Sequence, residues 1–177
     1  TELEFHKCPH CPLTEIAYPH CPLAARLAII VKRFDGILSY DHVHVSVVTE
    51  ERVTSQETSA QRGISALMGL VMATSGCPHT AYFRPMARFH LPFATSEETI
   101  YRAASMYLLA QYFLKREGRD SDFELDGLAK IYDGLQTINR SIADRLRSAT
   151  ETDSSINALV AVSVSAKTLA SVMNQSL

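Results

Sequence analysis

Every cysteine of this chain is followed directly by a proline. The Cys-Pro pairs begin at the four residues Cys8, Cys11, Cys21 and Cys77. A proline fixes its own φ and has no N–H, so it interrupts helices and central strands. Residues 7–22 are rich in proline and histidine and can form only an irregular loop, although Pro22 suits the first turn of a following helix. The chain therefore starts with a stiff Cys/Pro/His loop that has to be anchored elsewhere.

The spacing of these cysteines indicates a metal site. Cys8-Pro-His-Cys11 resembles the knuckle of zinc-ribbon proteins, in which a tight turn presents two thiolates to one ion. Cys21 and Cys77 complete a tetrahedral set, with gaps of 2, 9 and 55 residues between successive cysteines. Zinc accepts four thiolates without any redox demand. We predict that zinc binds all four and so cross-links the N-terminal loop to the chain around residue 77.

Other ligands and cofactors stay open at this stage. An imidazole could replace one sulfur, and the histidines close to the cysteines are His6, His10, His20 and His79. Cysteine followed by proline also occurs in ferredoxins, so an iron–sulfur cluster is the alternative cofactor, although the spacing differs from the ferredoxin pattern. The thiols could also be free or form a disulfide. A closed four-sulfur zinc site is structural, whereas a site with three protein ligands can activate water.

A second feature is an acid-free basic stretch, residues 58–96, which contains no Asp or Glu. Arg84 and Arg88 are four residues apart and share a face if this piece is helical. Together with His90 they could clamp a carboxylate or phosphate, and the start of a helix near Ser96 adds free N–H groups. We predict an anion-binding surface at Arg84, Arg88 and His90. The alternative is that these arginines form structural ion pairs with acids from elsewhere.

An enzyme is the alternative from a different functional class. An open metal site, or Cys77 acting as a nucleophile beside His79, could attack an anionic substrate held by the arginines. However, we expect Cys77 at the C-terminal end of a helix, where the dipole opposes a thiolate. The sequence also contains no Walker loop, Rossmann glycine pattern, H-E-x-x-H or G-x-S-x-G. No catalytic residue is therefore predicted.

Hydrophobic periodicity predicts a predominantly helical α+β fold with about five helices and a small antiparallel β-hairpin. Helices are expected at about 22–38, 60–75, 95–118, 124–147 and 155–173. Alternation predicts strands at 43–47 and 53–58, joined by a polar turn, and residues 1–6 could end a further strand. Gly76 marks a helix end, and Thr95 with Glu98 forms a capping-box pattern. We expect a single domain over 1–177, with 148–155 leading to the last helix.

Composition narrows the class of protein further. A chain of 177 residues buries roughly 70% of the surface that its unfolded form exposes, so a substantial core forms without metal. A net charge of −2 argues against nucleic acid as a partner. No run approaches the roughly 18 apolar residues of a membrane span, and no signal-peptide pattern opens the sequence. The small disulfide-stapled class is usually shorter and denser in cysteine, so we expect a reducing, cytoplasmic setting.

Several long runs also carry a resemblance. These runs are CPHCPL, YPHCPLA, SYDHVHV, QRGISALMGLVMATSGCPHTAYFRPMARFHLPFA and EETIYRAASMYLLAQYF. Over about residues 8–135 the chain resembles a bacterial domain family without an assigned activity. The resemblance implies a bacterial, cytoplasmic origin and contributes no catalytic roles.

The predicted function is a zinc-stabilised cytoplasmic binding or interaction module with an Arg/His surface for an anionic small molecule or protein partner. The alternatives are the enzyme described above and an iron–sulfur redox sensor or electron carrier. Self-association stays open, because a helix-rich surface with tyrosines could support it, although the sequence contains no heptad seam.

Overall fold

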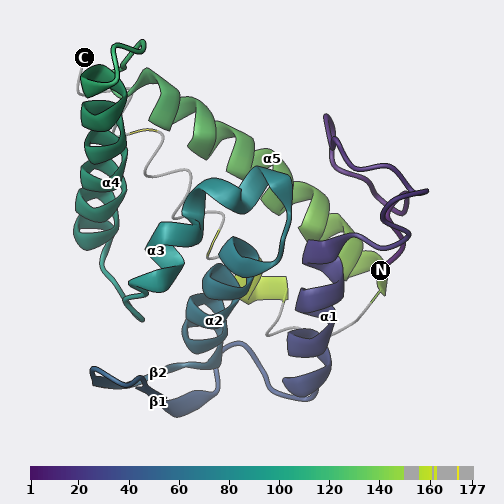
Figure 1. Cartoon of the computed structure of the whole chain (residues 1–177). Helices are drawn as coiled ribbons and strands as arrows, with labels where there is room; N and C mark the ends of the chain where they lie inside the picture. Colours follow the sequence, from purple (N-terminus) through teal and green to yellow (C-terminus); the bar gives the residue numbers. More distant parts are fainter. Residues whose placement is uncertain (150–155, 161, 163–170, 172–177) are drawn as a thin grey trace.

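The computed structural model describes residues 1–149, 156–160, 162 and 171. In chain order the elements are α1 (Pro22–Arg33), β1 (His42–Val48), β2 (Val53–Ser59), α2 (Ala60–Thr74), the 3-10 helix η1 (Pro78–Phe83), α3 (Arg84–Arg88), α4 (Ser96–Arg116) and α5 (Asp126–Ala149). This is the predominantly helical α+β architecture that the sequence predicts. In Figure 1, α5 runs across the structure from the end of α4 to the N-terminal loop.

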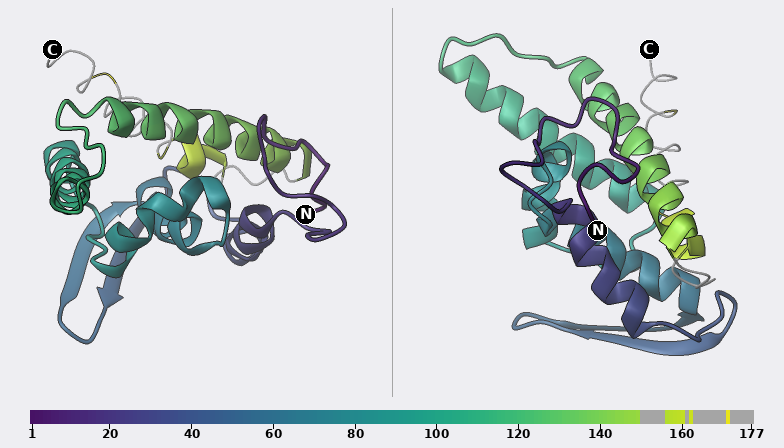
Figure 2. Two further views of the ribbon diagram at one scale, coloured as in Figure 1. Left: turned by 45° about the horizontal axis from the view of Figure 1, so that its top comes forward. Right: turned by 90° about the vertical axis from the view of Figure 1, so that its right-hand side faces the viewer.

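The two strands form the predicted antiparallel hairpin. Val48 pairs with Val53 next to the turn, and His42 pairs with Ser59 at the base. The exposure of side chains alternates along β1, as period-2 patterning requires. Both strands contact α2, and a Cβ at Gly63 of α2 would lie 2.9 Å from Val45 Cγ2. The hairpin otherwise extends away from the helices, as Figures 1 and 2 show.

One hydrophobic core joins α1, α2 and the C-terminal half of α5. Leu27 and Met68 are completely buried, and Ile142 is 1% exposed. Leu3 of the N-terminal segment belongs to the same core. Burial of each such side chain stabilises the fold by about 1.5–3 kcal/mol. The core therefore contains residues from both ends of the described chain.

A second core lies between η1, α4 and the N-terminal half of α5. Its buried residues include Phe83, Ala103, Tyr107, Leu128 and Tyr132. Leu135 of α5 packs against both cores, so α5 connects them. At the start of α4 the predicted capping box is present: Thr95 N donates to Glu98 Oε2 at 2.7 Å, and Glu98 N donates to Thr95 Oγ1 at 3.2 Å.

Two predicted elements differ from the structure, and the last predicted helix is described only in part. The first helix ends at Arg33 rather than near residue 38, because the chain turns at Gly36 with φ +81°. The strand expected within residues 1–6 is reduced to one antiparallel bridge between Glu2 and His20. Of the helix expected at 155–173, residues 156–160 are helical, and most of the remainder lies outside the described residues, as does the segment 150–155.

Candidate functional site: a thiol cluster and a basic cavity

A buried arginine holds the N-terminal segment on α5. Arg145 is 4% exposed, and its guanidinium donates to the backbone carbonyls of Glu2 at 2.7 Å, Leu3 at 2.7 Å and His6 at 3.3 Å. No carboxylate of the described chain pairs with it. Because these partners are main-chain atoms, no charge pattern in the sequence predicts the contacts of Arg145. The only sequence signal is an arginine next to the apolar stripe of α5.

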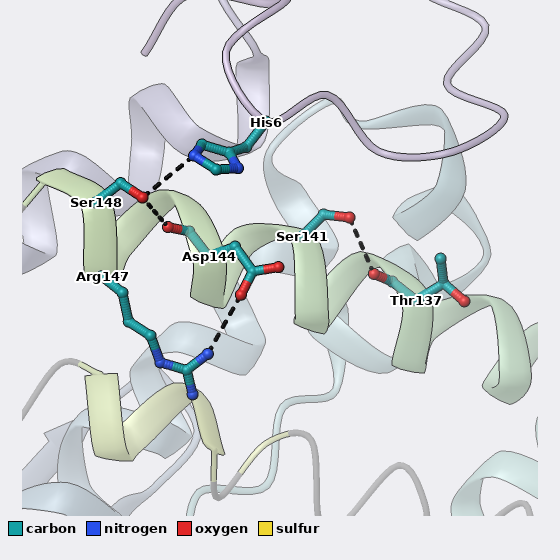
Figure 3. Close-up of polar contacts among 6 residues, drawn as sticks. All are labelled: His6, Thr137, Ser141, Asp144, Arg147 and Ser148. Atoms are coloured by element: carbon teal, nitrogen blue, oxygen red, sulfur yellow. Dashed lines mark hydrogen bonds and ion pairs between the residues drawn. The ribbon is translucent and has the colours of Figure 1, made fainter.

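A second contact lies one helical turn further along α5 (Figure 3). Ser148 Oγ is 3.2 Å from His6 Nε2 and donates to Asp144 O at 2.9 Å. His20, another alternative metal ligand, has its Nδ1 3.3 Å from Thr1 Oγ1. Both histidines therefore have hydrogen-bond partners of their own in this structure.

The Cys8-Pro-His-Cys11 segment forms a hydrogen-bonded turn. Cys11 N donates to Cys8 O at 3.2 Å, and His10 at the third position has φ +61°. Proline at the second position and a positive φ at the third are the features of a type II β-turn. His10 itself is exposed. The turn places the two cysteines at its ends, where both pack against the first core.

The structure brings all four thiols to one region of that core. Cys21 and Cys77 are buried at 7% and 6% exposure, and Cys8 and Cys11 are half-buried. Burial raises the pKa of the Cys8 thiol, and the nearby Cys21 and Cys11 raise it further. Burial likewise raises the pKa of the Cys77 thiol, with smaller contributions from Cys21 and Cys8. Such interactions need proximity, so Cys8 lies near each of the other three.

The cluster is not a closed metal shell as it stands. All four cysteines are free, and among the described residues no three Cys, His, Asp or Glu side chains are arranged to hold a metal ion. Two polar groups of α5 nevertheless act on one of the sulfurs. The Ser141 hydroxyl and then the charge of Arg145 lower the pKa of the Cys8 thiol and oppose the effect of burial. Figure 3 places Ser141 on α5, one turn from Thr137.

The surroundings of Cys77 differ from the prediction. The chain leaves α2 at Thr74, reverses at Gly76 with φ +90°, and then enters η1 with Cys77 at its N-cap. The backbone N–H groups of His79 and Thr80 donate to the Cys77 sulfur and oppose the effect of burial on its pKa. Cys77 therefore follows the end of α2, as the sequence predicts, but it is also the N-cap of η1, which the sequence does not predict. A buried thiol with a raised pKa is a poor nucleophile, so this geometry does not favour catalysis by Cys77.

A cavity of about 480 Å³ lies between α2, α3, α4 and α5. Its wall is mostly apolar and includes Leu70, Phe83, Met86, Leu91, Phe93 and Leu135. Of the described residues that line it, none is Asp or Glu, whereas Arg62, His90 and Arg102 are basic. Most of the lining residues come from the acid-free stretch 58–96. This origin explains why no carboxylate side chain lines the cavity.

Arg102 of α4 is the most constrained of these basic groups. Its Nη2 donates to Phe89 O at 2.6 Å and to Met86 O at 3.1 Å, which fixes the guanidinium against α3. Burial lowers the pKa of Arg102, and it has no ion pair with a carboxylate in the part of the chain that the structure describes. Burial, and then the charge of Arg102, lower the pKa of His90. His90 is therefore neutral at pH 7 and can donate or accept a hydrogen bond.

The structure divides the predicted anion-binding residues. His90 lines the cavity, but Arg84 and Arg88 are exposed and are not among its lining residues. Arg88 lies 5.9 Å from the centre of the Phe89 ring. Sequence reasoning missed Arg102, because it follows the acid-free stretch and stands near Glu97 and Glu98 in the chain.

One short helix connects the two sites. Thr80 of η1 is 1% exposed, lines the cavity and has its Oγ1 2.7 Å from Met72 O and 3.2 Å from Cys77 O. Thr80 therefore links the backbone of Cys77 to the wall of the cavity.

Together these features define a helical α+β domain with a thiol cluster at one end of α5 and a basic cavity beside the same helix. None of the helices described here has the length and apolar character needed to cross a membrane. The chain belongs to the family named Domain of unknown function (DUF6901), whose model matches residues 1–177. Comparison with curated proteins and with solved structures gave no match.

Proposed function

We propose that this chain is a zinc-stapled, cytoplasmic ligand-binding domain. Zinc joins Cys8, Cys11, Cys21 and Cys77, and the basic cavity recognises an anionic ligand. The observation that carries the zinc site is the convergence of four free thiols on one core, with Cys8 coupled electrostatically to the other three. The four cysteines come from a Cys-x-x-Cys turn, the start of α1 and the start of η1, and this convergence of separate segments supports the zinc site.

The polar surroundings of the sulfurs also suit a metal thiolate. Four thiolates around Zn²⁺ carry a net charge of −2, which needs compensation in a buried site. Arg145 supplies a positive charge near Cys8, and N–H donors from η1 reach the Cys77 sulfur. Such outer contacts orient ligands and stabilise their charged form. The same Arg145 ties down the N-terminal segment, so zinc and arginine anchor one loop from two directions.

Closing the shell requires the cysteine side chains to move. Holding a side chain about 30° away from a preferred rotamer costs about 0.5–1.5 kcal/mol. Zinc binding to structural sites is worth roughly 10–16 kcal/mol at neutral pH. Metal binding can therefore draw the four sulfurs from a shared neighbourhood into tetrahedral contact.

Elemental analysis of protein purified anaerobically without added metal tests the zinc site. We expect one zinc per chain, and we expect each of the Cys→Ser variants at residues 8, 11, 21 and 77 to lose it. His10→Asn is the matched control, because Asn tolerates the positive φ of the turn and removes only the imidazole. Metal far below one per chain in all preparations contradicts the proposal. Stoichiometric iron with visible absorbance replaces it with the iron–sulfur alternative.

A further inference from the structure

We infer that the cavity binds a small amphipathic carboxylate, with the carboxylate at Arg102 and His90 and an apolar tail along α2 and α5. This inference rests on the proposed anion recognition by the cavity and adds the class of ligand. It does not depend on which metal the thiol cluster holds.

The position of Arg102 determines the head group. Nη2 already donates to two carbonyls, and the remaining N–H groups of the guanidinium are left for a ligand. Guanidinium groups bind carboxylates in a two-point geometry, which a partly buried and fixed guanidinium presents without further ordering. Glu98 in the first turn of α4 acts on Arg102 through its charge, but Glu98 is exposed, accepts from Thr95 N and does not line the cavity. None of the ion pairs of the described residues involves Arg102, so its guanidinium can take an anion from outside.

The charge count favours one negative charge rather than two. Arg102 is the partly buried cation of the cavity, His90 is neutral at pH 7, and Arg62 is exposed. One buried positive charge balances a monoanion, whereas a dianionic phosphate would keep an uncompensated charge in a mostly apolar wall. Tyr132 of α5 also lines the cavity and stays protonated, because burial raises its pKa. Its hydroxyl can therefore donate a hydrogen bond to an anion but does not repel one.

The size and wall of the cavity determine the rest of the ligand. About 480 Å³ falls within the range of small-molecule sites, so the cavity has room for a small molecule. Leu70, Phe83 and Leu135 belong to the apolar part of the lining. Burying an alkyl or aromatic tail there contributes about 0.8 kcal/mol for each CH₂ group. A short, fully polar anion would leave this apolar wall in contact with water.

Titration calorimetry on the zinc-loaded wild-type protein tests the two halves of the ligand separately. Octanoate is the probe, acetate has the head without the tail, and 1-octanol has the tail without the charge. We expect octanoate to bind at least about tenfold more tightly than acetate or 1-octanol. Acetate lacks several buried methylenes and 1-octanol lacks the charged hydrogen-bonded contact, and each of these contributes enough free energy for about a tenfold change in affinity. Octyl phosphate at pH 8 tests the charge count and should bind more weakly than octanoate.

Two variants locate the binding. Arg102→Gln should weaken octanoate binding by about tenfold or more, whereas Arg88→Gln, an exposed arginine outside the cavity, should leave it unchanged. Ala66→Met fills part of the cavity without touching Arg102 and should also weaken binding. If Arg102→Gln does not fold, the Ala66→Met variant and the wild-type titrations with octanoate, acetate and 1-octanol still test the ligand class.

The outcomes separate this inference from the proposed function. Equal affinity for octanoate and octanol, or no binding of octanoate by zinc-loaded protein, overturns the ligand class and leaves the zinc staple in place. Tighter binding of octyl phosphate than octanoate supports anion recognition but contradicts the monoanion. Octanoate binding to protein that never carries metal supports the inference and removes the zinc staple.

Discussion

Replacing Arg145 with methionine should undock the N-terminal segment from α5. Methionine keeps much of the apolar stem of the side chain but removes the guanidinium that donates to Glu2 O, Leu3 O and His6 O. Two of these bonds are 2.7 Å long, and a hydrogen bond from a charged donor is worth about 1.5–3 kcal/mol. The exposed Glu2 and His6 can regain water, so part of this is recovered. We expect a loss of about 3 kcal/mol in the free energy of unfolding.

Arg147→Met is the matched control on the same helix. Arg147 forms an exposed ion pair with Asp144 at 3.3 Å, visible in Figure 3, and such pairs contribute about 0–1 kcal/mol. Urea unfolding followed by far-UV circular dichroism gives both values, because the chain contains no tryptophan to report by fluorescence. Limited proteolysis should cleave within residues 1–22 faster in the Arg145 variant alone. Equal stabilities of the two variants would refute the docking role of Arg145.

Three further substitutions probe separate features. Thr95→Ala removes the side-chain acceptor of the capping box and should lower the free energy of unfolding by about 1 kcal/mol in the same urea assay; no change would mean that the box does not hold the start of α4. Tyr82→Phe should raise stability by about 1 kcal/mol, because the Tyr82 hydroxyl is buried without a hydrogen-bond partner in the described structure, and a loss of stability would reveal a partner. In ligand-free protein, His90 has a lowered pKa, so the unfolded chain binds its proton at a higher pH than the folded one. Stability should therefore fall as the pH drops below about 6.5, and His90→Gln should make this dependence shallower, whereas an identical pH profile would contradict the burial of His90 beside Arg102.

Local patterns predicted the parts of the fold whose causes are local. The alternating valines of β1, the stop at Gly76 and the capping box at Thr95 all depend on residues within a few positions of one another, and the structure confirms each. The end of α1 was wrong because apolar spacing continues past Gly36, while the backbone does not. Periodicity predicts which side chains can be buried, but it does not predict where a turn ends the helix.

The functional residues show where a single sequence stops being informative. The four Cys-Pro pairs and the acid-free stretch are visible as composition, and the structure places them in a thiol cluster and in the wall of a cavity. Arg145 and Arg102 are not visible in this way, because both bind backbone carbonyls, which every residue possesses. The partners of Arg145 lie 139 to 143 positions away in the chain, so only the tertiary fold brings them together.

X-ray absorption at the zinc edge, on protein purified anaerobically from unsupplemented medium, tests the central claim most directly. A four-thiolate site predicts one zinc per chain surrounded by four sulfur atoms at about 2.3 Å, and no lighter ligand. A shell dominated by nitrogen or oxygen near 2.0 Å, or a preparation without zinc, would contradict it.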